Sequence, residues 1–132
     1  MTDPAGEIRH LLNRYQEAMS SGDLTTLCDL HWQDHRFVHV EDGGLDSGWG
    51  TYEDRLKFRF ERGTDDFHLT NVRIEVFHGK FGSAIATWES FVAGSSSRGG
   101  GTVSFVLSRM GSSWKIVADH HAPPGADPGS DR

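Results

Sequence analysis

The chain has 132 residues, of which 36% are hydrophobic, and it carries a formal net charge of −6. That length is enough for one hydrophobic core but not for two, so we expect a single domain. The lysines and arginines are scattered without a basic stripe, which argues against binding to nucleic acid or to an anionic membrane surface.

Two amphipathic helices are predicted at the start of the chain. In residues 7–22 the apolar side chains recur at helical spacing, and Gly22 is a typical residue at which a helix ends. Asp23 is then a suitable N-cap for a shorter helix over residues 24–32.

Strand-forming sequences make up most of the remaining chain. Residues 35–41 are rich in β-branched and aromatic side chains, which predicts a short strand. After a turn-rich loop, a third helix is predicted over residues 51–63, with Thr51 as its N-cap. Four longer strands follow, separated by glycine-containing turns: residues 67–77, 83–93, 101–110 and 114–122.

This order of elements predicts an α+β fold, in which three N-terminal helices pack in the concave face of a strongly curved, mainly antiparallel sheet. Such a sheet forms a cone with an open mouth, and a small molecule can bind inside it. We expect this single domain to span residues 1–122. Residues 123–132 are rich in Pro, Gly and Asp, and we expect them to form a disordered tail.

Targeting and redox signals are few. No apolar run approaches the roughly 20 residues of a membrane span. The first ten residues contain acids instead of the apolar run of a signal peptide, so we expect a cytoplasmic protein. A single cysteine, Cys28, leaves no internal disulfide bond to form.

Three stretches resemble the nuclear transport factor 2-like superfamily, and its SnoaL-like and ketosteroid-isomerase-like members most clearly. They are RYQEAMSSGDLTTLCDLHWQDHRFV, the pair Gly48 and Trp49, and the ending GSSWKIVADHHA. The resemblance extends from about residue 7 to residue 122 and implies the cone-shaped fold and a homodimer formed sheet to sheet. It leaves the function open, because the superfamily includes isomerases, polyketide cyclases, epoxide hydrolases, dehydratases and non-catalytic domains.

The ketosteroid isomerases supply candidate catalytic residues by position. Their oxyanion tyrosine precedes the helix-ending glycine by seven residues, where this chain has Tyr15, and their carboxylate base corresponds to His39. An imidazole with a pKa near ~6.5 is an effective base at neutral pH. A buried phenol can donate to a developing oxyanion. The second acid of the isomerases is absent from TVSFVLS, where Ser104 is the polar candidate, so steroid isomerisation itself is not expected.

Strand alternation predicts which side chains of the last strand face the cavity. Trp114, Ile116 and His120 share one face, whereas Lys115 and Asp119 lie on the other. A lysine is best placed outward, so we expect His120 to face inward as a second acid/base group. Asp119 and His120 then point to opposite faces and do not form a dyad.

Aromatic rings and two hydroxyl groups are expected to line the pocket. These residues are Trp32, Trp49, Phe60, Trp88, Ser90 and Ser104. A purely structural reading remains for the catalytic candidates as well. Tyr15 can be a core tyrosine, His39 can face solvent, and His120 can bond to the backbone.

A periodic set of histidines raises the question of a metal. His31, His35 and His39 recur at every fourth residue, which would place them on one face only if a single helix continued through all three. The predicted helix ends near Gln33, and no nearby cysteine or carboxylate completes a ligand set. We therefore expect no metal and no cofactor.

The sequence thus favours a cofactor-free acid/base enzyme that acts on a small apolar carbonyl-containing molecule, of the isomerase, cyclase or dehydratase type. In this hypothesis His39 is the base, His120 the second acid/base group and Tyr15 the oxyanion donor. The alternative is a non-catalytic domain that binds a small hydrophobic ligand or dimerises. The expected partners are a small hydrophobic molecule and a second copy of the chain.

Overall fold

The computed structural model describes residues 3–92 and 97–123, and the predicted tail from residue 124 onward lies outside them. Its elements in chain order are α1 (Pro4–Ser21), α2 (Leu24–Leu30), β1 (Val38–Glu41), β2 (Gly44–Ser47), α3 (Trp49–Glu61), β3 (Asp66–Phe77), β4 (Phe81–Phe91), β5 (Ser97–Met110) and β6 (Ser113–Ala122). Among these helices none is long and apolar enough to cross a membrane.

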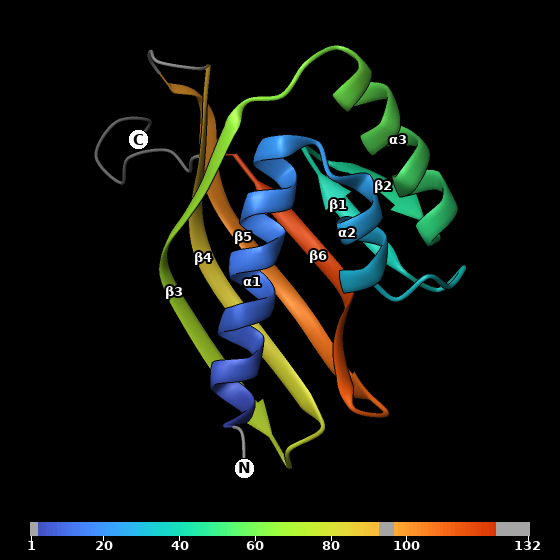
Figure 1. Ribbon diagram of the computed structural model, residues 1–132, viewed down its shortest axis with the longest axis vertical. Coiled ribbons are helices and arrows are strands. Elements are labelled where there is room, and N and C mark those ends of the chain that lie inside the picture. The colour runs from blue at the N-terminus through green and yellow to red at the C-terminus, as the bar shows by residue number, and fades with distance from the viewer. Residues whose placement is uncertain (1–2, 93–96, 124–132) are drawn as a thin grey trace, which may run out of the picture.

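All the described strands belong to one sheet, in the order β2-β1-β6-β5-β4-β3. Neighbouring strands are antiparallel except β1 and β6, which run parallel. Helix α1 lies across the inner face of the long strands, and α3 lies at one end of the sheet near β1 and β2 (Figure 1). The predicted α+β fold, with three helices on a curved and mainly antiparallel sheet, is confirmed.

Local sequence signals account for the ends of the first two helices. Gly22 ends α1 in the left-handed conformation, with φ 71°, which glycine adopts without steric cost. Asp23 caps α2, because its carboxylate accepts the backbone N–H of Thr26 at 3.1 Å.

The predicted start of α3 at Thr51 is wrong by two residues. The helix begins at Trp49 after Gly48, and no side chain caps it. Instead, the N–H of Gly48 donates to the carbonyl of Phe37, and the N–H of Trp49 donates to that of Asp34. Backbone carbonyls from a preceding loop thus satisfy donors that a capping side chain would otherwise serve.

The predicted loop after β1 contains the short strand β2, which pairs with β1 in an antiparallel hairpin. Asp42 and Gly43 form its turn with φ values of 50° and 78°. Two successive positive φ angles in an Asp-Gly pair are typical of the tight turns that join hairpin strands. This hairpin fixes the position of Glu41 at the end of β1.

The core lies between α1 and the inner face of the sheet, and α2 and α3 close its end. Its fully buried members include Ile8, Leu27, Phe37, Leu56, Phe105, Leu107 and Ile116. Most of these apolar positions follow from helical or strand periodicity, which places every core element with its apolar face inward.

A β-bulge interrupts the pairing between β5 and β6. Leu107 pairs with Ile116, whereas the preceding Val106 pairs with Ala118, so Val117 is an extra residue without a cross-strand partner. A bulge of this kind shifts the alternation of inward and outward side chains by one position.

The bulge corrects one prediction directly. Ile116 is buried as expected, but beyond the bulge Asp119 and His121 are buried and His120 is exposed. The predicted inward direction of His120 is therefore wrong, because strict alternation along β6 ends at the bulge.

Candidate functional site

Strands β1 and β6 bring four ionisable side chains together on the inner face of the sheet. In the parallel register His39 lies beside Asp119, and Glu41 lies beside His121. His39, Asp119 and His121 are buried, and Glu41 is partly buried. Residues about 80 positions apart in the sequence thus form one compact polar cluster.

His39 lies between two carboxylates. Its Nδ1 is hydrogen-bonded to Asp119, and its Nε2 lies 2.9 Å from Oε1 of Glu41. Burial alone would lower the pKa of His39, but the hydrogen bonds to Asp119 and Glu41 outweigh it and raise the pKa to about 9. The ring is therefore an imidazolium at neutral pH, and both of its N–H groups donate to carboxylates.

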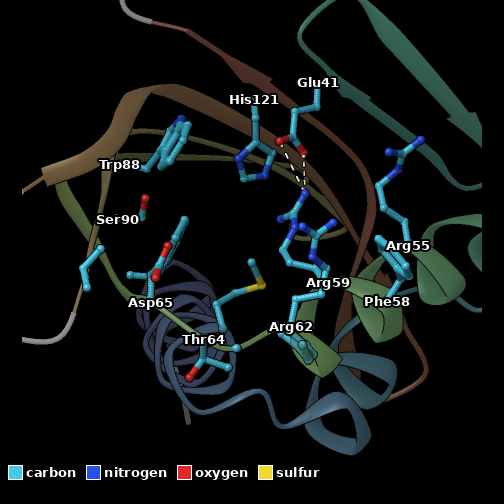
Figure 2. A pocket seen from close by; sticks show the side chains of 15 residues that line it. Glu41, Arg55, Phe58, Arg59, Arg62, Thr64, Asp65, Trp88, Ser90 and His121 are labelled. Carbon is cyan, nitrogen blue, oxygen red and sulfur yellow. Dashed lines mark hydrogen bonds and ion pairs between the residues drawn. The ribbon is translucent and has the colours of Figure 1, made fainter.

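Arg59 of α3 continues this chain of charges. Its Nη2 donates to both carboxylate oxygens of Glu41, at 3.3 and 3.4 Å (Figure 2). The hydrogen bond from His39 lowers the pKa of Glu41 to about 2 against the opposing effect of burial, with Arg59 contributing further. Carboxylates and cations therefore alternate through the cluster, in the order Asp119, His39, Glu41 and Arg59.

His121 lies at the edge of this cluster, and its Nε2 is 3.3 Å from the hydroxyl of Tyr15. Burial lowers the pKa of His121, opposed chiefly by the charge of Asp119, so the ring is neutral at physiological pH. Burial also raises the pKa of Tyr15 well above its ordinary value, and its hydroxyl stays protonated. In the tautomer in which Nε2–H donates to the Tyr15 oxygen, the other ring nitrogen of His121, Nδ1, can accept a proton.

His31 forms the deepest part of the cluster. Its Nδ1 donates to the carbonyl of Leu27 at 2.6 Å, and burial lowers its pKa to about 4. Its Nε2 faces Oδ2 of Asp119 across 4.0 Å, and neither atom has a hydrogen-bond partner among the described residues. The ring stacks on Trp49 with 4.6 Å between centroids.

A cavity of about 760 Å³ opens beside the cluster, and His121 and Glu41 belong to its lining. Figure 2 shows Trp88 and Ser90 on one side of the hollow and Arg59 and Arg62 on the other. One wall therefore contains an aromatic ring, a hydroxyl group and the carboxyl group of Asp65, and the opposite wall is cationic.

The structure separates the predicted pocket residues into two groups. Phe60, Trp88 and Ser90 line this cavity. Trp49 is instead buried in the core, and Trp32 lies under the guanidinium of Arg36 at 4.7 Å.

Ser104 lies on the outer face of the sheet, so its predicted place in the pocket is wrong. It pairs with Ile85 on one side and with His120 on the other, and both partners are exposed. Directly paired residues of antiparallel strands point to the same face. The inward residues of this strand are Val103 and Phe105, which are buried.

The predicted catalytic residues also occupy different places. Tyr15 and His39 face the interior, where the first contacts His121 and the second contacts the two carboxylates. His120 is exposed and faces away from them. His121 takes the place in the cavity wall that the sequence assigned to His120.

Sequence reasoning missed Glu41, Asp119 and His121 as members of the site, and also the arginines of α3. The three buried or partly buried acid and imidazole groups depend on the β1–β6 pairing and on the bulge, neither of which has a local sequence signal. The arginines did have a local sequence signal: Arg55, Arg59 and Arg62 are spaced by four and three residues and therefore share a helix face.

One group of side chains has the composition of a metal site. Three possible ligand atoms, one from each of His39, Asp119 and His121, lie within 4.8 Å of one another. In the structure His39 uses Nδ1 and Nε2 in its bonds to Asp119 and Glu41, so a metal would have to displace a proton from that ring. The expected absence of a metal stays a prediction.

The sequence matches the model of the SnoaL-like domain over residues 8–125. The chain belongs to the SnoaL-like domain family. Solved structures of the nuclear transport factor 2-like superfamily share its fold. A search of curated protein sequences found no match.

Three of these solved structures show how similar their folds are to that of this chain. A superfamily protein from Salmonella enterica has a TM-score of 0.83 at 17% identity, with 98% of this chain and 96% of that chain covered. A protein of unknown function from Pseudomonas putida has a TM-score of 0.81 at 16% identity, with 97% and 91% covered. Another, from Shewanella oneidensis, has a TM-score of 0.78 at 19% identity, with 91% and 99% covered.

Proposed function

We propose that this SnoaL-like protein is a cofactor-free acid/base enzyme acting on a small carbonyl-containing molecule, of the isomerase, cyclase or dehydratase type. The observation that carries the proposal is His121, a buried imidazole that lines the cavity and is held by the Tyr15 hydroxyl at 3.3 Å. We assign the acid/base role to His121 in place of His120, whose side chain is exposed. A cytoplasmic location and a homodimer are parts of the same proposal.

In the proposed reaction the neutral ring of His121 removes a proton from a carbon next to the substrate carbonyl. The charges of Asp119 and Glu41 favour the imidazolium that forms, whereas burial and the charges of His39 and Arg59 oppose it and keep the resting ring neutral. Return of the same proton to another atom of the substrate completes an isomerisation. The reaction therefore needs no other reactant.

The surrounding side chains have supporting roles in this proposal. Ser90 and Arg59 line the cavity and offer O–H and N–H donors to the oxygen on which negative charge develops. Phe67 and Trp88 stack with 5.8 Å between centroids, and they form a flat wall for an apolar substrate body. His39 and Tyr15 then act as positioning residues, because their polar atoms contact other residues of the cluster.

A non-catalytic ligand-binding or dimerisation domain is the second candidate. The outer face of the sheet favours it, since Phe77, Phe81, Ile85 and Val106 are large apolar side chains that are about half exposed. Exposed apolar patches of this kind mark protein interfaces. A dimer formed through this face would also leave the cavity on the inner face accessible.

Exchange of carbon-bound protons for deuterium tests the acid/base proposal without knowledge of the natural product. We expect the protein to speed this exchange in members of a panel of small ketones and oxo acids, followed by proton NMR in D₂O. His121→Gln should slow it by roughly 10²–10⁴-fold, the usual contribution of a positioned acid/base group. His120→Gln changes the adjacent exposed ring and is the matched control.

Two outcomes separate the candidates. Exchange at the wild-type rate in the His121→Gln protein would remove His121 from the mechanism. Binding of panel members without any accelerated exchange would favour the non-catalytic candidate. The fold of each variant is checked by circular dichroism, because His121 is buried in the cluster.

A further inference from the structure

Three arginines line the cationic wall of the cavity, Asp65 lies on the opposite side with Ser90, and the carboxylates beside the arginines engage them unequally. Arg55, Arg59 and Arg62 all belong to the lining: the first two lie in the second half of α3, and Arg62 directly follows its last residue. Their partners differ. Arg55 is fully engaged, because its Nε and Nη2 bind both carboxylate oxygens of Asp46 at 2.6 and 2.9 Å.

Arg59 is only partly engaged. A single nitrogen, Nη2, reaches Glu41 through two long contacts of 3.3 and 3.4 Å, while His39 holds the same carboxylate at 2.9 Å. Within the described residues, Nε and Nη1 of Arg59 have no acceptor. Nε and Nη1 lie on different edges of the guanidinium group, so a carboxylate can accept two parallel hydrogen bonds from one of them together with the second N–H of Nη2.

Arg62 has no carboxylate partner in residues 3–92 or in the described side chains after them. Its guanidinium lies 5.4 Å from the ring centre of Phe58. Figure 2 shows Arg62 on the same side of the hollow as Arg59, across from Trp88 and Ser90. An anion bound between the guanidinium groups of Arg59 and Arg62 would therefore lie against that one wall of the cavity.

From this arrangement we infer that the substrate carries a carboxylate, which Arg59 and Arg62 bind while its apolar part packs on Phe67 and Trp88. This inference rests on the proposed function, and it narrows the substrate from an apolar carbonyl compound to a small oxo acid. The carboxylate orients the molecule, because the cationic and aromatic walls lie on opposite sides of the hollow. The reacting carbon then lies toward His121, which shares the lining with both walls.

The same arrangement disfavours an uncharged substrate. A neutral ketone or ester would offer Arg59 and Arg62 only an uncharged acceptor and would gain less from their charge. A hydrogen bond to a charged group contributes more than one between neutral groups, and two of them amount to a discrimination of about tenfold or more. The expected selectivity is therefore between an acid and a neutral analogue of equal shape.

Calorimetric titration with phenylacetate and with phenylacetamide tests the inference. The two probes have the same shape, neither needs to react, and only the first is an anion at neutral pH. We expect phenylacetate to bind at least about tenfold more tightly than the amide. Arg62→Gln and, separately, Arg59→Gln should each remove most of this difference. Arg73→Gln makes the same change of charge at an exposed position on β3 outside the cavity lining, and it should preserve the difference.

Several results would overturn the inference: equal binding of the two probes, no binding of phenylacetate at millimolar concentration, or Arg62→Gln behaving like Arg73→Gln. Arg62 makes no ion pair within the described part of the chain, so its replacement should leave the fold intact even if Arg59→Gln does not. The measurement is of binding alone. A failure here therefore leaves the acid/base role of His121 standing, and a failure of the exchange experiment leaves carboxylate binding standing.

Discussion

The charged state of His39 should make the stability of the protein fall as the pH rises above neutrality. Its pKa is about 9 in the folded protein and about 6.5 in the unfolded chain. Because the folded value is the higher one, this stabilisation is fully present below pH 6.5 and is lost as the pH rises through about 9. The perturbation is thus a simple change of pH.

The size of the effect follows from the separation of the two pKa values. The slope is about 1.4 kcal/mol per pH unit where the two states differ by one proton, and it is about half of that at pH 6.5 and at pH 9. The free energy of unfolding should therefore decrease by about 2–3 kcal/mol between these pH values. His39 and Asp119 are both buried, so solvent screens this pair little, whereas the partly exposed carboxylate of Glu41 is screened more.

Below neutrality the sign reverses. Burial lowers the pKa of His31 to about 4 and also lowers that of His121, so both rings must take up protons when the chain unfolds in acid. Their contribution is present above pH 6.5 and decreases as the pH falls below it. Opposite slopes on the two sides predict a stability maximum close to pH 6.5.

Urea unfolding at a series of pH values, followed by circular dichroism, measures this curve. His39→Gln should abolish the decrease between pH 6.5 and pH 9, and Glu41→Gln should reduce it by removing one of the two carboxylate partners. His120→Gln changes the exposed histidine between Asp119 and His121, and it should leave the dependence of stability on pH unchanged. A decrease of wild-type size that persists in His39→Gln would refute the reasoning.

Two further predictions concern the outer face of the sheet and the end of α1. Ile85 is 53% exposed on the outer face of the sheet, so Ile85→Asp should convert the proposed homodimer into a monomer, as measured by light scattering. Thr51→Asp, at an exposed position of α3, should not change the oligomeric state. A wild-type protein that is already monomeric would reject this interface. Gly22→Ala should lower the free energy of unfolding by about 1–2 kcal/mol, because Gly22 has φ 71° and a Cβ there would lie 3.0 Å from Thr64. Gly50→Ala is the same substitution at an open helical position, and it should stabilise the protein instead; equal effects of both alanines would contradict the conformational argument.

The sequence determined the fold because its signals are local and repeated. Helical spacing of apolar residues in α1, the Gly22–Asp23 junction and the alternation along β4 each agree with the structure. Many independent positions support each element, so the misplaced start of α3 and the missed β2 hairpin did not alter the architecture.

The candidate site was only partly accessible in the same way. Tyr15 and His39 both face the interior. Tyr15 lies on the apolar stripe of α1, whereas His39 was assigned from the position of the base in the ketosteroid isomerases, which its strand resembles. His120 was misplaced because the extra residue Val117 in β6 moves it to the opposite face. Ser104 was misplaced because its apolar neighbours Val103 and Phe105 take the inward positions of β5.

Tertiary structure alone decided which groups meet. The extra residue Val117 turns Asp119 and His121 inward, and the parallel pairing of β1 with β6 places them beside His39 and Glu41. Charge, burial and hydrogen bonding then fix the protonation of each ring, and these depend on distances between residues far apart in the chain. The sequence contained the ionisable groups, but only the packed sheet determines which histidine is charged and which one lines the cavity.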